Sequence, residues 1–116
     1  MNALRNSVQL VGNLGNEVDL KTLDSGTTVA SFPLATNEYY KNAKGEKIQQ
    51  TQWHNIIAWG KPAELMKSYL SKGSEVMVRG KLTSRSYEDK EGTKRYITEV
   101  RVNEFICFDK KAETPF

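Results

Sequence analysis

The fold is decided by the stretch Lys61-Pro62-Ala63-Glu64-Leu65-Met66-Lys67-Ser68-Tyr69-Leu70-Ser71-Lys72-Gly73. Pro62 suits the first turn of a helix, and Gly73 suits a C-terminal cap. The apolar side chains between them recur at three- and four-residue spacing, at Leu65, Met66, Tyr69 and Leu70. We therefore predict one short amphipathic helix over this stretch.

Apolar stretches on both sides of this helix indicate strands. Three precede it and two follow it, over residues 8–14, 29–35, 53–59, 76–82 and 96–108. Each is bounded by turn-forming residues, as the strands of a small barrel or sandwich are. Three strands, a helix and two strands is the order of an oligonucleotide-binding barrel, in which a helix between strands 3 and 4 closes one end. We expect an all-β, five-stranded barrel of this kind, although the pattern leaves other five-stranded barrels open.

Length and composition fit one domain. The chain has 116 residues, of which 38% are hydrophobic, and this is enough for a modest core without disulfide or metal staples. We expect a domain over residues 1–108 and a short polar tail over residues 109–116. The polar segments 37–50 and 88–93 are predicted to be mobile hairpins, which are loops and not linkers.

Cysteine and histidine are too few for several kinds of site. With one of each, the chain has neither an internal disulfide nor the usual ligands of a zinc site, so we expect no metal and no cofactor. The start of the chain lacks the apolar core of a secretory signal, and no apolar run approaches the roughly 20 residues of a membrane helix. We expect a cytoplasmic protein.

Both tryptophans fall on one face of the third predicted strand. Side chains alternate between the two faces of a strand. One face then carries Trp53, Asn55, Ile57 and Trp59, and the other carries His54, Ile56 and Ala58. A place in the core is one interpretation of the indoles, and a solvent-facing platform is the other. A lone strand histidine such as His54 is more typical of a hydrogen-bonded structural residue than of a catalyst.

The fourth predicted strand carries basic residues. Alternation separates Val76, Val78, Gly80 and Leu82 from Met77, Arg79, Lys81, Thr83, Arg85 and Tyr87. Aromatic rings among lysines and arginines are what binding of single-stranded DNA without sequence specificity requires, because every base has a face to stack on and every nucleotide has a phosphate. The net charge of +3 favours a polyanion only weakly, and an ordinary solvated strand face is the alternative.

Rings and cations are also neighbours in the polar segment 37–50. Tyr39 and Tyr40 are followed by Lys41, Lys44 and Lys47. Tyrosines on a long polar loop have few core positions to fill, so we expect these rings to contact a ligand.

Six motifs follow one another in a fixed order. They are Val8-Gln9-Leu10-Val11-Gly12-Asn13-Leu14, Ala35-Thr36, Thr51-Gln52-Trp53-His54, Gly60-Lys61-Pro62-Ala63-Glu64, Tyr69-Leu70-Ser71-Lys72-Gly73-Ser74 and Thr98-Glu99-Val100. Together they resemble the bacterial single-stranded-DNA-binding protein family, in register from about Asn6 to Asn103. The resemblance implies a homotetramer of oligonucleotide-binding barrels that wraps single-stranded DNA at the nucleoid during replication, recombination and repair.

The resemblance also assigns residues to the nucleic acid. The stacking aromatics would be Tyr40, Trp53, Trp59 and Tyr87, and the phosphate-contacting cations would be Lys41, Lys61, Lys72 and Arg85. His54 matches a family histidine at the subunit interface. Ser86 stands where the family often has lysine. Arg79 and Lys81 stand where the family more often has acidic or neutral polar residues, and they could compensate if they face the DNA.

The end of the chain departs from the family pattern. Family members typically carry a long Gly-, Gln- and Pro-rich segment and then several aspartates before a terminal Pro-Phe. Here Pro115 and Phe116 are kept without the spacer, and Glu113 is the nearest acid. We expect Phe116 to reach replication and repair proteins through a basic pocket, with an affinity weakened by the missing charge. A frayed end without a partner is the alternative.

Two other classes of protein stay open. A nuclease would need clustered carboxylates, and its candidates Glu88, Asp89 and Glu91 lie on one hairpin tip, which is a poor place for a preorganised site. We therefore expect no enzymatic activity. A primosomal-type or RNA-binding module of the same fold is the second alternative, because the residues give no sign of how a 2′-hydroxyl would be read.

Overall fold

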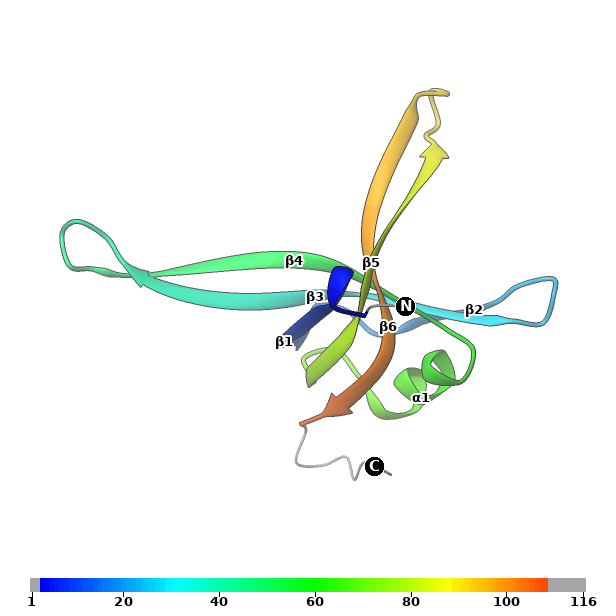
Figure 1. The fold of residues 1–116 in the computed structure, drawn as a ribbon, viewed down its shortest axis with the longest axis horizontal. Helices are drawn as coiled ribbons and strands as arrows, with labels where there is room; N and C mark the ends of the chain where they lie inside the picture. Colours follow the sequence, from blue (N-terminus) through cyan, green and yellow to red (C-terminus); the bar gives the residue numbers. More distant parts are fainter. Residues whose placement is uncertain (1–2, 109–116) are drawn as a thin grey trace.

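Residues 3–108 are described by a computed structural model, and they form six strands, one α-helix and a short 3-10 helix. The elements are η1 (Ala3–Arg5), β1 (Val8–Leu14), β2 (Asp19–Thr22), β3 (Thr28–Lys41), β4 (Lys47–Trp59), α1 (Lys61–Tyr69), β5 (Glu75–Glu88) and β6 (Lys94–Cys107). Figure 1 shows a central barrel with α1 beneath it and hairpins that project in different directions.

The strands close into a barrel. Their order in the sheet is β1-β5-β6-β4-β3-β2, and additional pairing of β1 with β3 at Asn13↔Ala35 and Leu14↔Leu34 completes the ring. Gly12 permits this closure, because a Cβ there would collide with the carbonyl oxygen of Ala35. The prediction of an all-β oligonucleotide-binding barrel with one short helix is confirmed. The four-residue β2 was not predicted, so α1 follows β4 and precedes β5.

Inward-facing side chains of the strands and one face of α1 fill the barrel. The largest fully buried side chains are Leu34, Ile56, Met66, Val76 and Val78. The helix begins after Gly60, whose φ of 69° favours glycine, and it has Pro62 in its first turn. The prediction of a helix as far as Gly73 is too long. The helix ends at Tyr69 because Leu70 is extended and buries its side chain.

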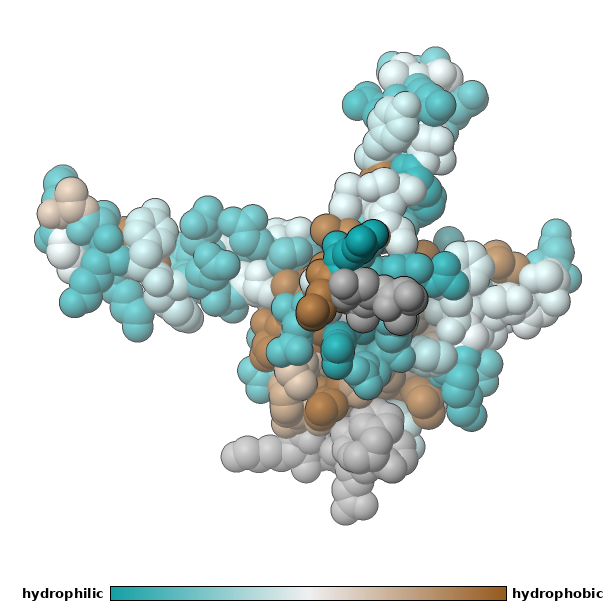
Figure 2. Space-filling view, in the orientation of Figure 1, coloured by the Kyte–Doolittle hydropathy of each residue, from teal (hydrophilic) through white to brown (hydrophobic). Residues whose placement is uncertain are grey.

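Two long arms leave the barrel as hairpins, one formed by β3 and β4 and the other by β5 and β6 (Figure 1). The first is paired as far as Lys41↔Lys47 and the second as far as Glu88↔Lys94. The segment 37–50 is the hairpin that the sequence predicts, but its description as a loop is wrong for residues 37–41 and 47–50, which are strand. Polar residues form strands here because water reaches both faces of an arm, and Figure 2 shows the arms as mainly hydrophilic.

The two arms end in turns with the same hydrogen bonds. The side-chain oxygen of Asn42 accepts from the backbone N–H groups two and four residues later, at 2.9 and 3.0 Å. One carboxylate oxygen of Asp89 accepts from the corresponding groups of its own turn, both at 2.9 Å. Gly45 and Gly92 follow in each turn with φ of 79° and 80°. Each arm thus ends in a turn held by a side chain, as Asn and Asp allow.

Candidate nucleic-acid interface

The outer face of β4 carries both tryptophans. Trp53 is 61% exposed and Trp59 is 36% exposed, whereas Ile56 and Ala58 on the opposite face are almost fully buried. The predicted alternation of faces is confirmed, and the interpretation of the indoles as core residues is wrong. Two large aromatic surfaces therefore meet solvent on one strand.

Trp53 lies against the backbone of the segment that follows β1. A Cβ added to Gly15 would stand 2.5 Å from ring atom Cζ3 of Trp53 and 3.4 Å from the ring of Pro33. The N–H of Gly15 donates to the carbonyl oxygen of Pro33 at 2.9 Å, so this backbone is itself anchored to β3. The absence of a side chain at Gly15 is what lets the indole lie where it does.

Trp59 is in contact with a cation that sequence reasoning missed. The guanidinium of Arg101 lies 5.3 Å from the centre of the Trp59 ring, within range of a cation–π interaction. Arg101 is paired with Ile57 of β4 in the ladder, so it shares the outer face of the barrel with the indoles. The signal was present in the sequence, because exposed Arg101 alternates with the buried Val100 and Val102.

A groove of about 440 Å³ crosses the surface beside this strand. Its lining comes from β2, β3, β4, β5, β6 and the segment between β1 and β2, namely Asn16, Glu17, Asp19, Ser31, Phe32, Pro33, Asn55, Ile56, Arg85, Ile97 and Glu99. Asn55 stands on the indole face between Trp53 and Trp59, so the groove and the exposed rings adjoin. The lining carries three carboxylates against one guanidinium.

Arg85, a predicted phosphate contact, is already paired in the free protein. Its Nε lies 3.0 Å from one carboxylate oxygen of Glu99, and its Nη2 lies 3.3 Å from the other. The side chain of Glu99 is only 8% exposed. The hydrogen bond and the negative charge of Glu99 raise the pKa of Arg85 further above its ordinary high value. A phosphate at Arg85 would have to compete with this carboxylate.

The three predicted lysines are all exposed, but they lie in different parts of the molecule. Lys61 opens α1 two residues after Trp59. Lys72 precedes β5, and its backbone N–H donates to the Glu17 carboxylate of the groove at 2.6 Å. Lys41 closes the β3–β4 ladder opposite Lys47.

The arms present the predicted tyrosines, but not all on one side. Tyr87 is 45% exposed and alternates in phase with Arg85 along β5. Tyr40 is 51% exposed, but it does not lie on the side of the indoles. Ala35 pairs with Trp53 and shares its side, and alternation along β3 puts Tyr40 on the other face from Ala35. Tyr39 continues the row of Ala35 and so shares the side of the indoles. The ammonium of Lys47 lies 4.7 Å from the centre of the Tyr39 ring.

His54 lies on the face of β4 opposite the indoles, as predicted. Its Nε2 is 2.9 Å from the hydroxyl of Thr36, across the β3–β4 pair. His54 is partly buried in this single chain. The contact holds the imidazole in place, as expected for a structural histidine.

The carboxylates proposed for a nuclease are not gathered into a site. Asp89 uses one oxygen for its turn and the other for the Nε of Arg95, 3.0 Å away. The structure brings no group of three or more histidine, cysteine, aspartate or glutamate side chains into a metal-binding cluster within residues 3–108. In the same part of the chain, no helix is long and apolar enough to cross a bilayer.

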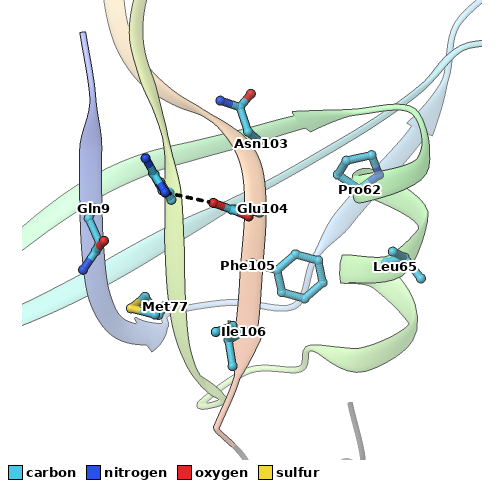
Figure 3. Close-up of a pocket in the computed structure, with 9 residues that line it drawn as sticks. Gln9, Pro62, Leu65, Met77, Asn103, Glu104, Phe105 and Ile106 are labelled. Carbon is cyan, nitrogen blue, oxygen red and sulfur yellow. Dashed lines mark hydrogen bonds and ion pairs between the residues drawn. The ribbon is translucent and has the colours of Figure 1, made fainter. Parts of the chain in front are cut away.

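A second, more apolar pocket of about 510 Å³ lies on another side of the barrel, between β1, β5, β6 and α1. Figure 3 shows Met77 and Ile106 on neighbouring strands, with Phe105 and Leu65 on the side of the helix. Arg79 lines this pocket and pairs with Glu104 at 3.3 Å. Glu104 thus already pairs with Arg79 at this second pocket, and the compensating role of Arg79 in DNA binding stays a prediction.

Comparison with known sequences gives a consistent result. The sequence model of the Single-strand binding protein family matches residues 5–108. Single-stranded DNA-binding protein 1 of Chlorobaculum tepidum is 44% identical over 105 residues, covering 90% of this chain and 62% of the relative. The protein of that name from Xylella fastidiosa is 38% identical over 109 residues, with 93% and 80% covered. The Single-stranded DNA-binding protein of Bacteroides thetaiotaomicron is 44% identical over 108 residues, with 91% and 67% covered.

The chain thus spans less than two thirds of the Chlorobaculum relative. Among solved structures, the SSB of Plasmodium falciparum in complex with ssDNA matches with a TM-score of 0.80 and 34% identity, over 90% of this chain and 95% of the other. A deletion mutant of the single-stranded DNA binding protein from Thermus aquaticus matches with a TM-score of 0.78 and 24% identity, over 91% and 51%. The second likeness concerns the fold alone.

Proposed function

Because this chain belongs to the single-strand binding protein family, we propose that it binds and protects single-stranded DNA without sequence specificity. The observation that carries the proposal is the pair of exposed indoles on one face of β4, beside a groove. A base that stacks on an indole gains roughly 1–3 kcal/mol whatever its identity, a general value for proteins of this kind. Duplex DNA hides its base faces, so this surface discriminates against it.

Phosphates and bases take different parts of this surface. The groove lining carries Glu17, Asp19 and the paired Glu99, which repel phosphate oxygens but accept hydrogen bonds from the amino groups of bases. The phosphates then run along the margins, where exposed cations stand. Lys72 stands beside Glu17 of the groove. As the resemblance implies, we also assign Lys61 and Lys41 to phosphates, and Tyr40 and Tyr87 on the arms to bases. Affinity should therefore fall as salt rises, because bound phosphates release counterions.

We propose that this binding serves DNA replication, recombination and repair, and that the protein acts at the nucleoid in the cytoplasm. We also propose that it has no catalytic activity. Single strands are exposed in each of these processes, which is where a protein that covers bases is needed. The engagement of both oxygens of Asp89 in its turn and with Arg95 argues against the nuclease alternative.

Titration with a dT oligonucleotide tests the proposal. Tryptophan emission should be quenched strongly when bases stack on Trp53 and Trp59, and duplex DNA of the same length should compete poorly. A matched rU oligonucleotide tests the RNA-binding alternative, and stronger competition by rU would favour it. Unchanged emission at low salt, with no binding seen by a labelled strand, would defeat the proposal.

Assembly as a homotetramer is part of the proposal, and an apolar stripe supports it. Val11, Met77 and Ile106 stand directly opposite one another in register across β1, β5 and β6. Val11 is 47% exposed and Ile106 is 42% exposed, and Figure 3 shows Met77 and Ile106 at the adjoining pocket. A stripe of this kind across a sheet is typical of a surface that another subunit covers. His54 is a further candidate interface residue.

The division into a domain over residues 1–108 and a tail over residues 109–116 stays part of this proposal. Pro115 and Phe116, the predicted contacts to replication and repair proteins, lie outside the described residues. The recruitment that we propose for them rests on the resemblance of the terminal Pro-Phe alone.

A further inference from the structure

We propose that Arg101 and Lys81 form a phosphate-binding subsite beside Trp59. The proposal deepens the proposed function and rests on it, since the phosphate belongs to the strand whose base stacks on this indole. Neither cation comes from the set that the family resemblance assigns. The subsite would hold the DNA backbone where it passes the end of β4.

The two cations share one surface. Lys81 of β5 stands directly opposite Arg101 of β6, and Arg101 stands beside Ile57 of β4. Paired residues project to the same side of a sheet, so both cations lie on the outer face that carries the indoles. Both are exposed.

Their charges are not balanced by carboxylates. Arg79, Arg85 and Arg95 each pair with an acid. Within residues 3–108, by contrast, no ion pair involves Arg101 or Lys81. Glu99, two residues before Arg101 on the same face, directs both oxygens to Arg85. The subsite therefore keeps two positive charges free for an anion.

The arrangement is unfavourable unless an anion is bound. Like charges directly opposite each other on paired strands destabilise a sheet. A phosphate between Arg101 and Lys81 would relieve this repulsion and accept hydrogen bonds from the guanidinium, which matches phosphate oxygens well. The contact of Arg101 with Trp59 holds the guanidinium next to the stacked base while leaving the ring 36% exposed.

Salt-dependent binding of a fluorescein-labelled dT oligonucleotide tests the subsite, with Arg101→Gln, Lys81→Gln and the matched control Arg79→Gln. The control removes the same charge from the same strand as Lys81, but from a guanidinium that Glu104 already pairs at the second pocket. Arg101→Gln should weaken binding about tenfold, as expected for one lost charge-assisted contact. Arg101→Gln and Lys81→Gln should each lower the slope of log K against log salt by about 0.7, the value for one phosphate on a single strand. Arg79→Gln should leave the slope unchanged.

Thermal unfolding of the same variants supplies a second readout. Arg101→Gln should unfold at the same temperature as the unchanged protein or higher, because it removes a like-charge contact. Should that variant fail to fold, Arg101→Lys takes its place and should keep the salt slope while binding a few fold more weakly, about threefold.

Three results would overturn the subsite while leaving the proposed function intact. The first is an affinity and slope unchanged in Arg101→Gln. The second is weaker binding with an unchanged slope, which would mean that Arg101 only holds Trp59 in position. The third is an equal loss of slope in Arg79→Gln, which would indicate net charge alone. Failure of the unchanged protein to bind the oligonucleotide at low salt would instead overturn the proposed function.

Discussion

At the scale of single residues, a backbone without a side chain positions the most exposed indole. Trp53 rests over Gly15, and Gly15 is held to β3 by its hydrogen bond to Pro33. The φ of Gly15 is not in the left-handed region, so glycine is needed there for space and not for backbone conformation. The orientation of a binding residue is thus set by a residue that carries no functional group.

Gly15→Ala should therefore weaken DNA binding with little loss of stability. The added methyl would displace the end of the indole, which can move into solvent, so the free energy of unfolding changes little. Binding of a labelled dT oligonucleotide, measured together with a denaturant titration, checks both statements. The double variant with Trp53→Ala should bind no more weakly than Trp53→Ala alone. Additive losses would show that Gly15 acts elsewhere.

At this scale, the predictions were correct where the alternation of side chains along one strand determines which face a residue occupies. Alternation placed Trp53 and Trp59 on one face, and the structure exposes both rings, although Ile57 between them is buried. The pairing between distant strands could not be predicted from the sequence. This pairing decides that Arg85 forms an ion pair with Glu99 and that the guanidinium of Arg101 lies over the ring of Trp59. The roles assigned to the eight DNA-binding positions and to His54 remain predictions.

At the scale of elements, the two arms extend the binding surface beyond the barrel. Their strands are polar and exposed on both faces, so a pattern that looks for one buried face reads them as loops. The turns at the tips do have a sequence signal, an Asn or Asp followed three residues later by a glycine, and Asn42 and Asp89 each hold such a turn. The extent of the arms depends on ladder pairing, which hydrophobic periodicity does not report.

The β5–β6 arm should respond to acid through Asp89. The hydrogen bond from Arg95, and then that from the backbone of Thr93, lower the pKa of Asp89 below its ordinary value. A lowered folded-state pKa means that the ionised carboxylate stabilises the turn. That contribution is fully present above the ordinary pKa of about 4 and is lost as the pH falls through the lowered value. The Thr93 amide shift, followed by NMR as the pH is lowered, should report this transition.

Asp89→Asn is the matched control for this titration. Asn42 makes the same turn contacts at the other tip, so an asparagine should keep the turn while losing the charge that Arg95 recognises. The Thr93 amide should then stop titrating in the acid range. A midpoint at or above the ordinary pKa of aspartate, or a transition that survives in Asp89→Asn, would contradict the assignment.

At the scale of the whole molecule, charge and apolar surface are divided between regions. The net charge of +3 is small, and paired arginines reduce the free positive charge still further. Among the cations of residues 3–108 without an ion pair, Lys81 and Arg101 lie on the indole side, whereas the stripe of Val11, Met77 and Ile106 crosses β1, β5 and β6. The order of strands and helix predicted a small five-stranded barrel but left other barrels of that size open, and the resemblance to the family favoured the oligonucleotide-binding barrel that the structure has. Which residues gather on which part of its surface could be determined only from the register of the strands.

Ile106→Asp should dissociate the proposed tetramer. A charge in the middle of the stripe would be buried without a partner if another subunit covers it, which is strongly unfavourable. Sedimentation should show a lower mass than for the unchanged protein, while a short dT oligonucleotide still binds. Leu23→Asp is the control, because Leu23 has the same 42% exposure in the turn between β2 and β3. A monomer mass for the unchanged protein across micromolar concentrations would exclude the tetramer.

The most direct test of base stacking on the exposed rings is the affinity of Trp53→Ala for a labelled dT oligonucleotide, compared with that of Tyr96→Ala. Tyr96 is 72% exposed, but it lies on the other face of the arm from Tyr87. Tyr87 pairs with Arg95, and alternation along β6 turns Tyr96 away from the face that Arg95 shares with Tyr87. Loss of one stacked base should weaken binding of Trp53→Ala roughly 5- to 150-fold, while Tyr96→Ala stays within about twofold. A Trp53→Ala protein that is folded and binds as tightly as the unchanged protein would contradict this account.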